Sequence, residues 1–460
     1  MLKKQFPVAS RNHSISRRKF LQAAAGVTAV SIVPSRVFGK NAPSNRITMG
    51  CIGVGGMGMR DLRAAMANED VQIIATCDPV SSSNEYGHWF KDGWQGPWFG
   101  REAAKRVVEY HYAQQAGRAD FKGCAAYIDF RELLARDDID TVTIVTPDHW
   151  HAPITVAAAR AGKDIYCEKP LSLTLSEGRV MVDEVRRNGR ILQTGTHRRS
   201  SPAARHFCEL IRNGRLGKLH KITIEIGKNH REGPKDNCAA QPVPEWLDYD
   251  MWLGPAPLAP YHKDRCLYSF RFISDYSGGN VTNLGAHAID LVQWATGNDL
   301  TGPVEIEDLG GVFPPEMLFD VANPAHFRCR YADKTEFECH TGERAAHVTF
   351  EGENGWLGFD DIMTASSPEL LRETIGPDEI HLYESSDHMR NFIDCVKSRR
   401  EPAGPVEVGH RSASICHLGN IAMMLKAKLK WDPVAEHFVG PNADSANRLL
   451  HRAYRGQWTL

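Results

Sequence analysis

The chain has 460 residues, of which 42% are hydrophobic and 24% are charged, and its formal net charge is −1. This length favours two domains over one, and the near balance of charge gives no support to binding of nucleic acid. The eleven cysteines are scattered singly, without C-x-x-C spacing, so the composition argues against a zinc site or a dense disulfide framework and predicts no metal. Cys51, Cys77 and Cys167 are expected to be small buried hydrophobes.

Residues 1–39 have the pattern of a targeting segment. Arg17 and Arg18 precede the moderately apolar stretch Leu21–Val33, which is too short to remain as a bilayer span. This pattern resembles a twin-arginine export signal, with a candidate cleavage site near Val37–Gly39. We expect a periplasmic or otherwise exported protein with no stable membrane span after cleavage of the signal.

The first part of the folded chain reads as strand, glycine turn and helix. The apolar run Ile47–Val54 leads into glycines in G-x-G-x-x-G spacing, and Met59–Met66 behind them has helical character. In this spacing the glycines make a tight turn, let the backbone approach a pyrophosphate, and let helix and strand pack closely. The residues predicted to bind the cofactor phosphates are Gly53, Gly55, Gly56, Met57 and Gly58.

A second strand and an acid complete this unit. Val71–Cys77 is a buried-strand candidate, and Asp78 follows at its tip, 20 residues after Gly58. A carboxylate there can accept both ribose hydroxyls and would repel a 2′-phosphate. The sequence therefore predicts NAD as the cofactor, in preference to NADP.

Strands and helices continue to alternate up to Thr194. Thr141–Val145 is entirely β-branched or aliphatic, as is typical of a central parallel strand. The alternation predicts an α/β fold with a doubly wound parallel sheet, the Rossmann fold, over residues 45–196. An aromatic-rich segment, Pro79–Gly100, is expected to be a loop. The further expected elements are helices over Arg101–Gln115, Phe130–Ala135, His151–Ala161 and Leu175–Asn188 and strands over Ala125–Asp129, Asp164–Cys167 and Ile191–Thr194.

Residues 197–460 have a different character and predict a substrate-binding α+β domain. Lys218–Ile226 alternates as an antiparallel strand would, and a helix is expected from Gly278 through Trp294. We expect an open-faced, mainly antiparallel sheet, with the last helices as candidates for packing back on the first domain. The other expected elements are strands over Phe327–Tyr331, Thr335–His340 and His347–Glu351 and helices over Ala203–Asn213, Met389–Lys397 and Arg411–Leu425.

The order of motifs resembles the glucose-fructose oxidoreductase and inositol dehydrogenase family (Gfo/Idh/MocA). Besides the glycine loop and Asp78, the resemblance rests on Thr146-Pro147-Asp148 followed by His151, on Glu168-Lys169-Pro170 after a strand, and on Gly285-Ala286-His287-Ala288-Ile289-Asp290. It implies an NAD-dependent oxidoreductase acting on a carbohydrate or polyol. It also implies that Thr146, Pro147, His151 and Glu168 belong to the cofactor site and that the protein is a homo-oligomer, a dimer or a tetramer.

The chemistry of such an oxidation calls for a base beside the nicotinamide. Hydride leaves a carbinol carbon only as the hydroxyl proton is removed, and Lys169 stands at the carboxyl end of a predicted strand, where burial would lower the pKa of its amine. In the family the corresponding lysine lies at the catalytic centre, and it also borders the cofactor. His287 matches the family's catalytic or substrate-orienting histidine. We predict Lys169 and His287 as the catalytic residues.

Five further residues are candidates for substrate binding. Dehydrogenases of this type commonly carry an aspartate four residues before the histidine, whereas this chain has Asn283, whose amide can position a hydroxyl but cannot take its proton. His197 and Arg198 can hold hydroxyls or a carboxylate of a sugar, or form salt bridges between domains. Trp150 can stack on a pyranose face. Tyr268 and Arg271 are weaker candidates for the same wall. Asp290 either orients the His287 imidazole or makes a local cap.

Three functions remain in competition. The first is an exported oxidoreductase with tightly bound NAD, because no free nicotinamide pool is expected outside the cytoplasm. The second is a redox-neutral glycosidase, in which transient oxidation of a glycoside at C3 allows elimination, addition of water and re-reduction. The third is a non-catalytic sugar-binding protein. The export signal and Asn283 favour a closed redox cycle or a two-substrate exchange only mildly.

Overall fold

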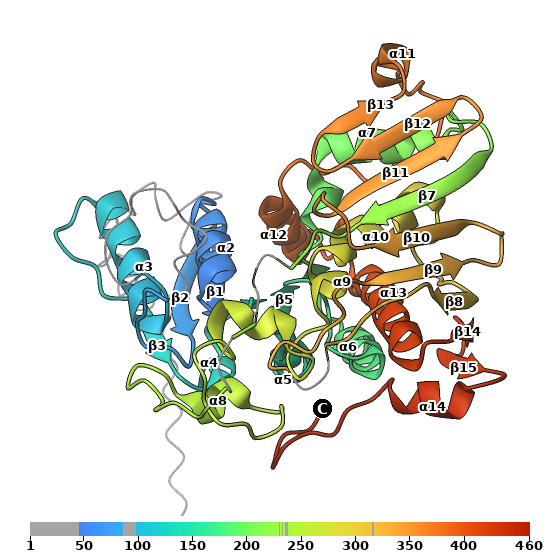
Figure 1. The fold of residues 1–460 in the computed structure, drawn as a ribbon. Helices are drawn as coiled ribbons and strands as arrows, with labels where there is room; N and C mark the ends of the chain where they lie inside the picture. The colour runs from blue at the N-terminus through green and yellow to red at the C-terminus, as the bar shows by residue number, and fades with distance from the viewer. Residues whose placement is uncertain (1–45, 86–97, 230, 232, 235–237, 315–316) are drawn as a thin grey trace, which may run out of the picture. The chain divides into compact units, whose positions relative to one another are not determined.

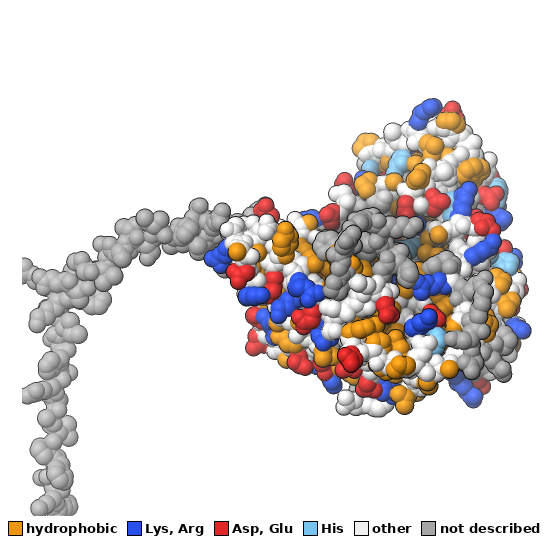
Figure 2. Space-filling model, turned by 60° about the vertical axis from the view of Figure 1, so that its left-hand side comes forward, with side chains coloured by type: hydrophobic (Ala, Val, Ile, Leu, Met, Phe, Trp, Pro, Cys, Tyr) orange, Lys and Arg blue, Asp and Glu red, His pale blue; other side chains and the backbone are white. Residues whose placement is uncertain are grey.

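The computed structural model describes residues 46–85, 98–229, 231, 233–234, 238–314 and 317–460. The predicted export segment and the middle of the aromatic-rich loop lie outside these residues. Residues 47–460 form one compact unit. Within the described ranges, no helix has both the length and the apolar composition needed to cross a bilayer. Acidic and basic side chains are interspersed over the face seen in Figure 2, in keeping with the small net charge.

The first domain is built on a six-stranded sheet whose order is β3-β2-β1-β4-β5-β6, with every neighbouring pair parallel (Figure 1). This confirms the predicted doubly wound fold. The carboxyl ends of β1 and β4 diverge at the switch point of this order, which is where such sheets bind nucleotides. Its elements are β1 (Ile47–Ile52), α2 (Gly56–Met66), β2 (Val71–Cys77), α3 (Arg101–Ala116), β3 (Ala125–Tyr127), α4 (Phe130–Leu134), β4 (Thr141–Ile144), α5 (His151–Arg160), β5 (Asp164–Cys167), α6 (Leu175–Arg187) and β6 (Leu192–Thr194).

The core strands are hydrophobic because both faces of the sheet are covered. Every residue of β4 and β5 is buried, as the β-branched sequence of β4 predicts. Cys51, Cys77 and Cys167 are buried free thiols in β1, β2 and β5, which confirms the expectation for them.

The second domain is built on a nine-stranded sheet, β13-β12-β11-β7-β10-β9-β8-β14-β15. Helices α7, α10 and α13 pack on one face of it, and the other face is open (Figure 1). The open face carries ion pairs such as Arg330 with Glu305 at 2.9 Å. The remaining elements are α7 (Pro202–Arg212), β7 (Leu219–Glu225), α8 (Tyr249–Leu253), α9 (Asn280–Asn283), α10 (Gly285–Thr296), β8 (Glu305–Asp308), β9 (His326–Arg330), β10 (Glu336–His340), β11 (His347–Gly352), β12 (Gly355–Phe359), β13 (Met363–Ala365), α11 (Pro368–Arg372), α12 (His388–Ser398), α13 (Val406–Leu425), β14 (Lys428–Asp432), β15 (His437–Val439) and α14 (Ala443–Arg448).

Strand β7 corrects one expectation. It pairs antiparallel with β11, as its alternation predicts, but it pairs parallel with β10. Parallel neighbours require a long crossover, and the segment from α8 to β9 supplies it. Alternation along one strand shows which residues face the core, but it carries no information about the direction of the neighbouring strands.

The helix expected from Gly278 through Trp294 is broken at Leu284 into α9 and α10. In a continuous helix the Asn283 carbonyl would accept the His287 N–H. Here the His287 N–H donates to the Leu284 carbonyl at 3.2 Å, and the Asn283 carbonyl accepts from Lys169 Nζ at 2.9 Å. The break therefore frees a main-chain acceptor for Lys169.

The last helices pack back on the first domain. Helix α13 lies against α6, and α12 lies against α2. At the latter contact Arg390 of α12 and Asp70 form an ion pair of 2.7 Å. These contacts join helices of the second domain to helices and an interstrand loop of the first.

Candidate active site

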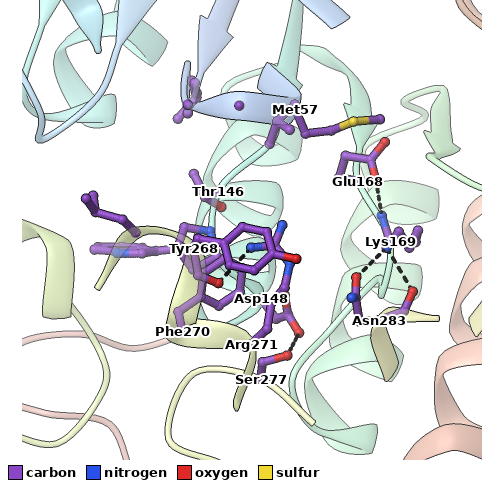
Figure 3. Close-up of a pocket in the computed structure, with 18 of the residues that line it drawn as sticks. Met57, Thr146, Asp148, Glu168, Lys169, Tyr268, Phe270, Arg271, Ser277 and Asn283 are labelled. Carbon is purple, nitrogen blue, oxygen red and sulfur yellow. Dashed lines mark hydrogen bonds between the residues drawn. The ribbon is translucent and has the colours of Figure 1, made fainter. Parts of the chain in front are cut away.

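A cavity of about 640 Å³ lies between the carboxyl edge of the parallel sheet and the second domain (Figure 3). Both domains contribute to its wall, so residues more than 200 positions apart in the sequence face each other across it. Of the residues predicted for the site, the cavity is lined by Gly53, Gly55, Gly56, Met57, Asp78, Thr146, Pro147, Trp150, Glu168, Lys169, His197, Arg198, Asn283 and His287. Gly58, His151 and Asp290 do not line it.

The glycine loop has the geometry that a dinucleotide requires. Gly53 has φ +79°, and a Cβ there would lie 2.5 Å from the Val145 carbonyl oxygen. A Cβ on Gly58 would lie 2.0 Å from the Gly53 carbonyl oxygen, so Gly58 serves close packing behind the cavity wall. No side chain caps α2, and its first turn has no acidic residue. The open N-terminus of α2 and the bare loop therefore fit a pyrophosphate.

Asp78 lies at the tip of β2 and is almost fully enclosed, with 4% of its surface exposed. Its Oδ2 accepts the Val54 N–H at 2.8 Å and its Oδ1 accepts the Val80 N–H at 2.9 Å. Burial raises the pKa of Asp78 to about 6, although these two hydrogen bonds oppose the shift. The carboxylate is thus ionised at neutral pH and fixed by the glycine loop.

Lys169 points from the end of β5 to the broken helix (Figure 3). Its Nζ donates to the Asn283 main-chain oxygen at 2.9 Å and to the Asn283 Oδ1 at 3.0 Å. Burial lowers the pKa of Lys169, and the neighbouring Glu168 partly offsets this effect. An ammonium held by two neutral acceptors loses its proton more readily than one paired with a carboxylate, which suits a general base.

Glu168 is buried below Lys169. Its Oε2 accepts the main-chain N–H of Lys169 at 3.1 Å, while its Oε1 has no hydrogen-bond partner within the described residues. Burial raises the pKa of Glu168, although the Lys169 charge opposes the shift, and burial together with Glu168 raises the pKa of Asp61. Because a Cβ on Gly195 would lie 2.3 Å from Oε1, the glycine there makes room for this carboxylate. Glu168 also lines the cavity, so its carboxyl group borders the space that a ribose or sugar would fill.

The two histidines of the site lie side by side. The rings of His197 and His287 have centroids 4.8 Å apart in an edge-to-face arrangement. Dense protein surroundings and the cations Arg198 and Lys169 lower the pKa of His197 to about 4, although solvent in the cavity reaches its ring. The pKa of His287 is also lowered, by burial and by Lys169, and its Nδ1 has no partner within the described residues. Both rings are therefore neutral at pH 7 and able to accept a proton or a hydrogen bond.

His151 and Trp150 are both held by hydrogen bonds to main-chain carbonyls. His151 is 1% exposed, and its ring nitrogens lie 2.7 Å from the Pro170 carbonyl and 2.9 Å from the Thr146 carbonyl. It therefore ties together the loops after β4 and β5 and does not line the cavity. The Trp150 indole donates to the Trp252 carbonyl at 3.0 Å and packs edge-on against Phe130 and Trp458. This packing does not support its stacking on a sugar.

Asp290 is also a structural residue, and neither the expected contact with the His287 imidazole nor a cap is made. It is 1% exposed and pairs with Arg199 at 2.8 Å, and it accepts the Ser412 hydroxyl at 2.9 Å. Asp290 follows His287 by one helical turn, but it does not line the cavity. Its carboxylate lies at the junction of α10, α13 and the loop after β6. Arg199 also pairs with Asp299, at 2.5 Å.

Replacing Asp290 by asparagine is expected to lower the free energy of unfolding by about 3 kcal/mol, because it leaves the buried Arg199 with one partner. The activity per folded molecule should be unchanged. Urea unfolding measures the first quantity and steady-state kinetics the second. As a control, Asp299→Asn should cost about 1 kcal/mol or less, since that carboxylate is 25% exposed. A kcat loss in Asp290→Asn at unchanged stability would instead support a role in the site.

Several residues of the cavity wall were not predicted, or only weakly. Asp148 is 5% exposed and accepts the Ser277 hydroxyl at 2.6 Å, which joins the two domains beside the site (Figure 3). The guanidinium of Arg271 lies 4.6 Å from the ring centroids of Tyr268 and of Phe270. Tyr268 and Arg271 were weak candidates in the sequence, whereas Phe270 gave no signal. The sequence signal for Ser277 is its position directly before Gly278 and Gly279, which is typical of a loop.

The chain matches two family models. Residues 203–460, more than half of the chain, match the model described as oxidoreductase family, C-terminal alpha/beta domain (GFO_IDH_MocA_C2). Residues 99–196 match the model described as oxidoreductase family, NAD-binding Rossmann fold (GFO_IDH_MocA).

Relatives and solved structures agree with these matches. An alpha-N-acetylgalactosaminidase of Shewanella oneidensis is 29% identical over 250 residues, which cover 48% of this chain and 50% of the relative. A myo-inositol 2-dehydrogenase of Thermotoga maritima is 32% identical over 124 residues, 27% of this chain and 33% of the relative. The chain thus spans half or less of these relatives. The crystal structure of an aldose-aldose oxidoreductase from Caulobacter crescentus covers 84% of this chain and 99% of its own, with a TM-score of 0.58 and 17% identity, which supports the fold alone.

Proposed function

Because the chain belongs to the Gfo/Idh/MocA oxidoreductase family, we propose that it is an NAD-dependent oxidoreductase acting on a secondary hydroxyl or ketone of a sugar, glycoside or polyol. The observation that carries the proposal is the position of Lys169. Its amine stands in the same cavity as the bare glycine loop, with a lowered pKa and with His287 beside it.

We assign each residue of the cavity a role in this reaction. Gly53, Gly55 and the N-terminus of α2 hold the pyrophosphate, and Glu168 accepts a hydroxyl. When bound, the nicotinamide accepts or donates a hydride. Lys169 Nζ takes the proton of the substrate hydroxyl, and His287 orients that hydroxyl or relays its proton. Asn283 holds Lys169 in place through two oxygens.

A redox-neutral glycosidase is the second candidate. It is favoured by the similarity to the alpha-N-acetylgalactosaminidase and by Asn283, which removes the carboxylate of an ordinary dehydrogenase relay. The same Lys169 would serve the oxidation of the sugar, and the cofactor would finish each turnover in its starting state.

One assay panel separates these functions. The purified protein is incubated with glycosides and with free sugars, with and without added NAD, while NADH absorbance and sugar release are followed. Steady NADH formation supports the oxidoreductase, sugar release without net NADH supports the glycosidase, and binding without either supports a sugar-binding protein. Failure to bind NAD at all would contradict the proposal.

Export and cofactor retention form part of the same proposal. The twin-arginine pattern in residues 1–39 supports export of the folded protein, and retention of NAD follows from the lack of a free pool outside the cytoplasm. We also propose a dimer or tetramer, from the family resemblance. Protein recovered from the periplasmic fraction should carry stoichiometric nucleotide by absorbance. Recovery of stable cofactor-free protein would count against retention.

The preference for NAD over NADP is expected to fall by about tenfold in Asp78→Asn, because roughly 1.4 kcal/mol of repulsion of the 2′-phosphate is lost. Since the pKa of Asp78 is raised to about 6, the carboxylate is ionised at pH 8, where the difference from wild type should be largest, and it is mostly protonated at pH 5.5, where the difference should be smaller. Fluorescence titration with both nucleotides at pH 8 and pH 5.5 measures this. An unchanged preference at pH 8 would mean that Asp78 does not face the 2′ position.

A further inference from the structure

One corner of the cavity is built around a buried arginine. Arg198 is 4% exposed, yet it lines the cavity. Its Nε donates to Asp361 Oδ1 at 2.9 Å, its Nη1 donates to the Ala346 carbonyl at 2.7 Å, and its guanidinium lies 5.7 Å from the Phe359 ring centroid. Its Nη2 donates no hydrogen bond to any described residue. The guanidinium is therefore fixed in direction and keeps donor capacity.

Further positive charge surrounds this corner. Arg60, on α2, lines the cavity and makes neither an ion pair nor a hydrogen bond with the described part of the chain. Its charge, with those of Arg198 and Lys169, acts on His197 and lowers the pKa of that ring. The three cations therefore line one cavity together with His197 and act on the same ring.

Negative charge is scarce at the same place. Asp361 is already paired with Arg198, and its side chain is 69% exposed. Glu168 accepts the main-chain N–H of Lys169. Burial raises the pKa of Glu168, which disfavours its charged form. Lys169 itself is held by an amide and a carbonyl of Asn283 and not by a carboxylate. Asp361 pairs with Arg198, and Glu168 and Asp148 act on Lys169, so Arg60 is the cation here that lacks an ion pair with the described residues, and a bound anion would supply one.

The wall beside Arg198 leaves room for such a group. It is formed by Ala345 and Ala346, whose side chains are single methyl groups. His197 offers a neutral ring to the same space, so a hydroxyl next to the anion has a hydrogen-bond partner. Because the corner adjoins Lys169 and His287, one ring of sugar size can reach both it and the reacting centre within the same cavity.

We propose that Arg60, His197 and Arg198 bind the anionic group of an acidic sugar, so that the substrate is a sugar or glycoside carrying a carboxylate or a phosphate and not a neutral one. The inference rests on the proposed function for the reaction at Lys169, but it concerns binding alone. The fixed guanidinium of Arg198 provides the specificity, and the exposed Arg60 of α2 provides a second positive charge.

The test is calorimetric titration of the NAD-loaded full chain with methyl glucuronide, methyl glucoside and glucose 6-phosphate. An anionic probe is expected to bind about 10- to 100-fold more tightly than the neutral glucoside, the range for hydrogen bonds to a charged group, and the advantage should shrink as salt is added. Preference for the glucuronide identifies a carboxylate, and preference for glucose 6-phosphate a phosphate. Equal affinity for all three probes, or no binding of either anionic probe, would overturn the proposal.

Variants locate the site. Arg60→Gln and Arg198→Gln should each remove most of the anion preference, whereas Arg63→Gln, an exposed position with the same change of charge on the same helix, should keep it. Arg60→Gln remains informative if Arg198→Gln fails to fold. Loss of NAD affinity in Arg60→Gln with an unchanged anion preference would assign Arg60 to the cofactor and overturn its role here. Tight glucuronide binding without NADH formation or sugar release would instead contradict the proposed function and leave this inference standing.

Discussion

Lys169→Met is expected to lower kcat/KM by about 10²- to 10⁴-fold, the usual contribution of a positioned general base. Methionine keeps the unbranched stem of the side chain but has no amine to take the substrate proton. NAD binding should persist, because the contact of Glu168 with this residue uses the main-chain N–H. Stopped-flow or steady-state kinetics measures the first effect, and titration with NAD the second.

The matched control for this variant is Lys163→Met. Lys163 is also buried in the first domain, but its Nζ donates to the carbonyls of Arg136 at 2.7 Å and of Ile139 at 2.8 Å, away from the cavity. Its loss should reduce stability and leave kcat/KM of the folded protein unchanged. Near wild-type turnover in Lys169→Met would remove Lys169 from the mechanism.

The pH profile gives a second readout of Lys169. A base works only when unprotonated, so activity should rise with pH through the pKa of Lys169, which burial lowers from its usual 10.5. In Asn283→Asp a carboxylate would face the ammonium, raise that pKa and move the rising limb to higher pH. A limb that does not move in this variant would show that another group titrates.

Gly53→Ala is expected to abolish NAD binding and to lower the free energy of unfolding by more than about 4 kcal/mol, a range reached by few substitutions. The methyl group would lie 2.5 Å from the Val145 carbonyl oxygen and 2.9 Å from the Thr146 nitrogen, both rigid backbone atoms. The positive φ of +79° adds strain for an L-residue. Thermal unfolding and NAD titration of the purified variant measure the two effects.

Gly162→Ala separates the close approach from the backbone strain. Gly162 has φ +76°, nearly that of Gly53, but a Cβ there meets nothing within 4 Å. Gly162→Ala should therefore lower the free energy of unfolding by only about 1–2 kcal/mol, the strain of the left-handed conformation, and should leave NAD binding intact. Equal losses in the two variants would mean that the contact of Gly53 with the loop after β4 contributes nothing.

Much of the fold could be predicted from local patterns. The strands Val71–Cys77 and Asp164–Cys167 have the bounds that the sequence indicated, because short, mostly apolar segments that end directly before an acidic residue leave few alternatives. Short strands such as β8 and β15 were not predicted, since three or four residues carry too little pattern. The parallel pairing of β7 with β10 could not be predicted either, because it depends on a partner more than 100 residues away.

The candidate site shows the same division. Motif position indicated Lys169, His287, Asn283 and the glycine loop, and the structure brings these residues to one cavity. Motif position did not distinguish a histidine that lines the cavity, such as His287, from one that ties two loops together, such as His151. Adjacent positions in a motif can point in opposite directions, and only the surrounding elements decide which direction is buried.

The sequence by itself determined the Rossmann domain, its glycine loop with the acid after β2, and the lysine at the end of β5, because these depend on short-range geometry within single βαβ units. Only the tertiary structure decided that Asp290 belongs to Arg199, that the chain breaks at Leu284 so that Asn283 can hold Lys169, and that Arg60 and Arg198 face the same space. Those facts arise where the two domains meet, and the contacts there join side chains that are far apart in the chain.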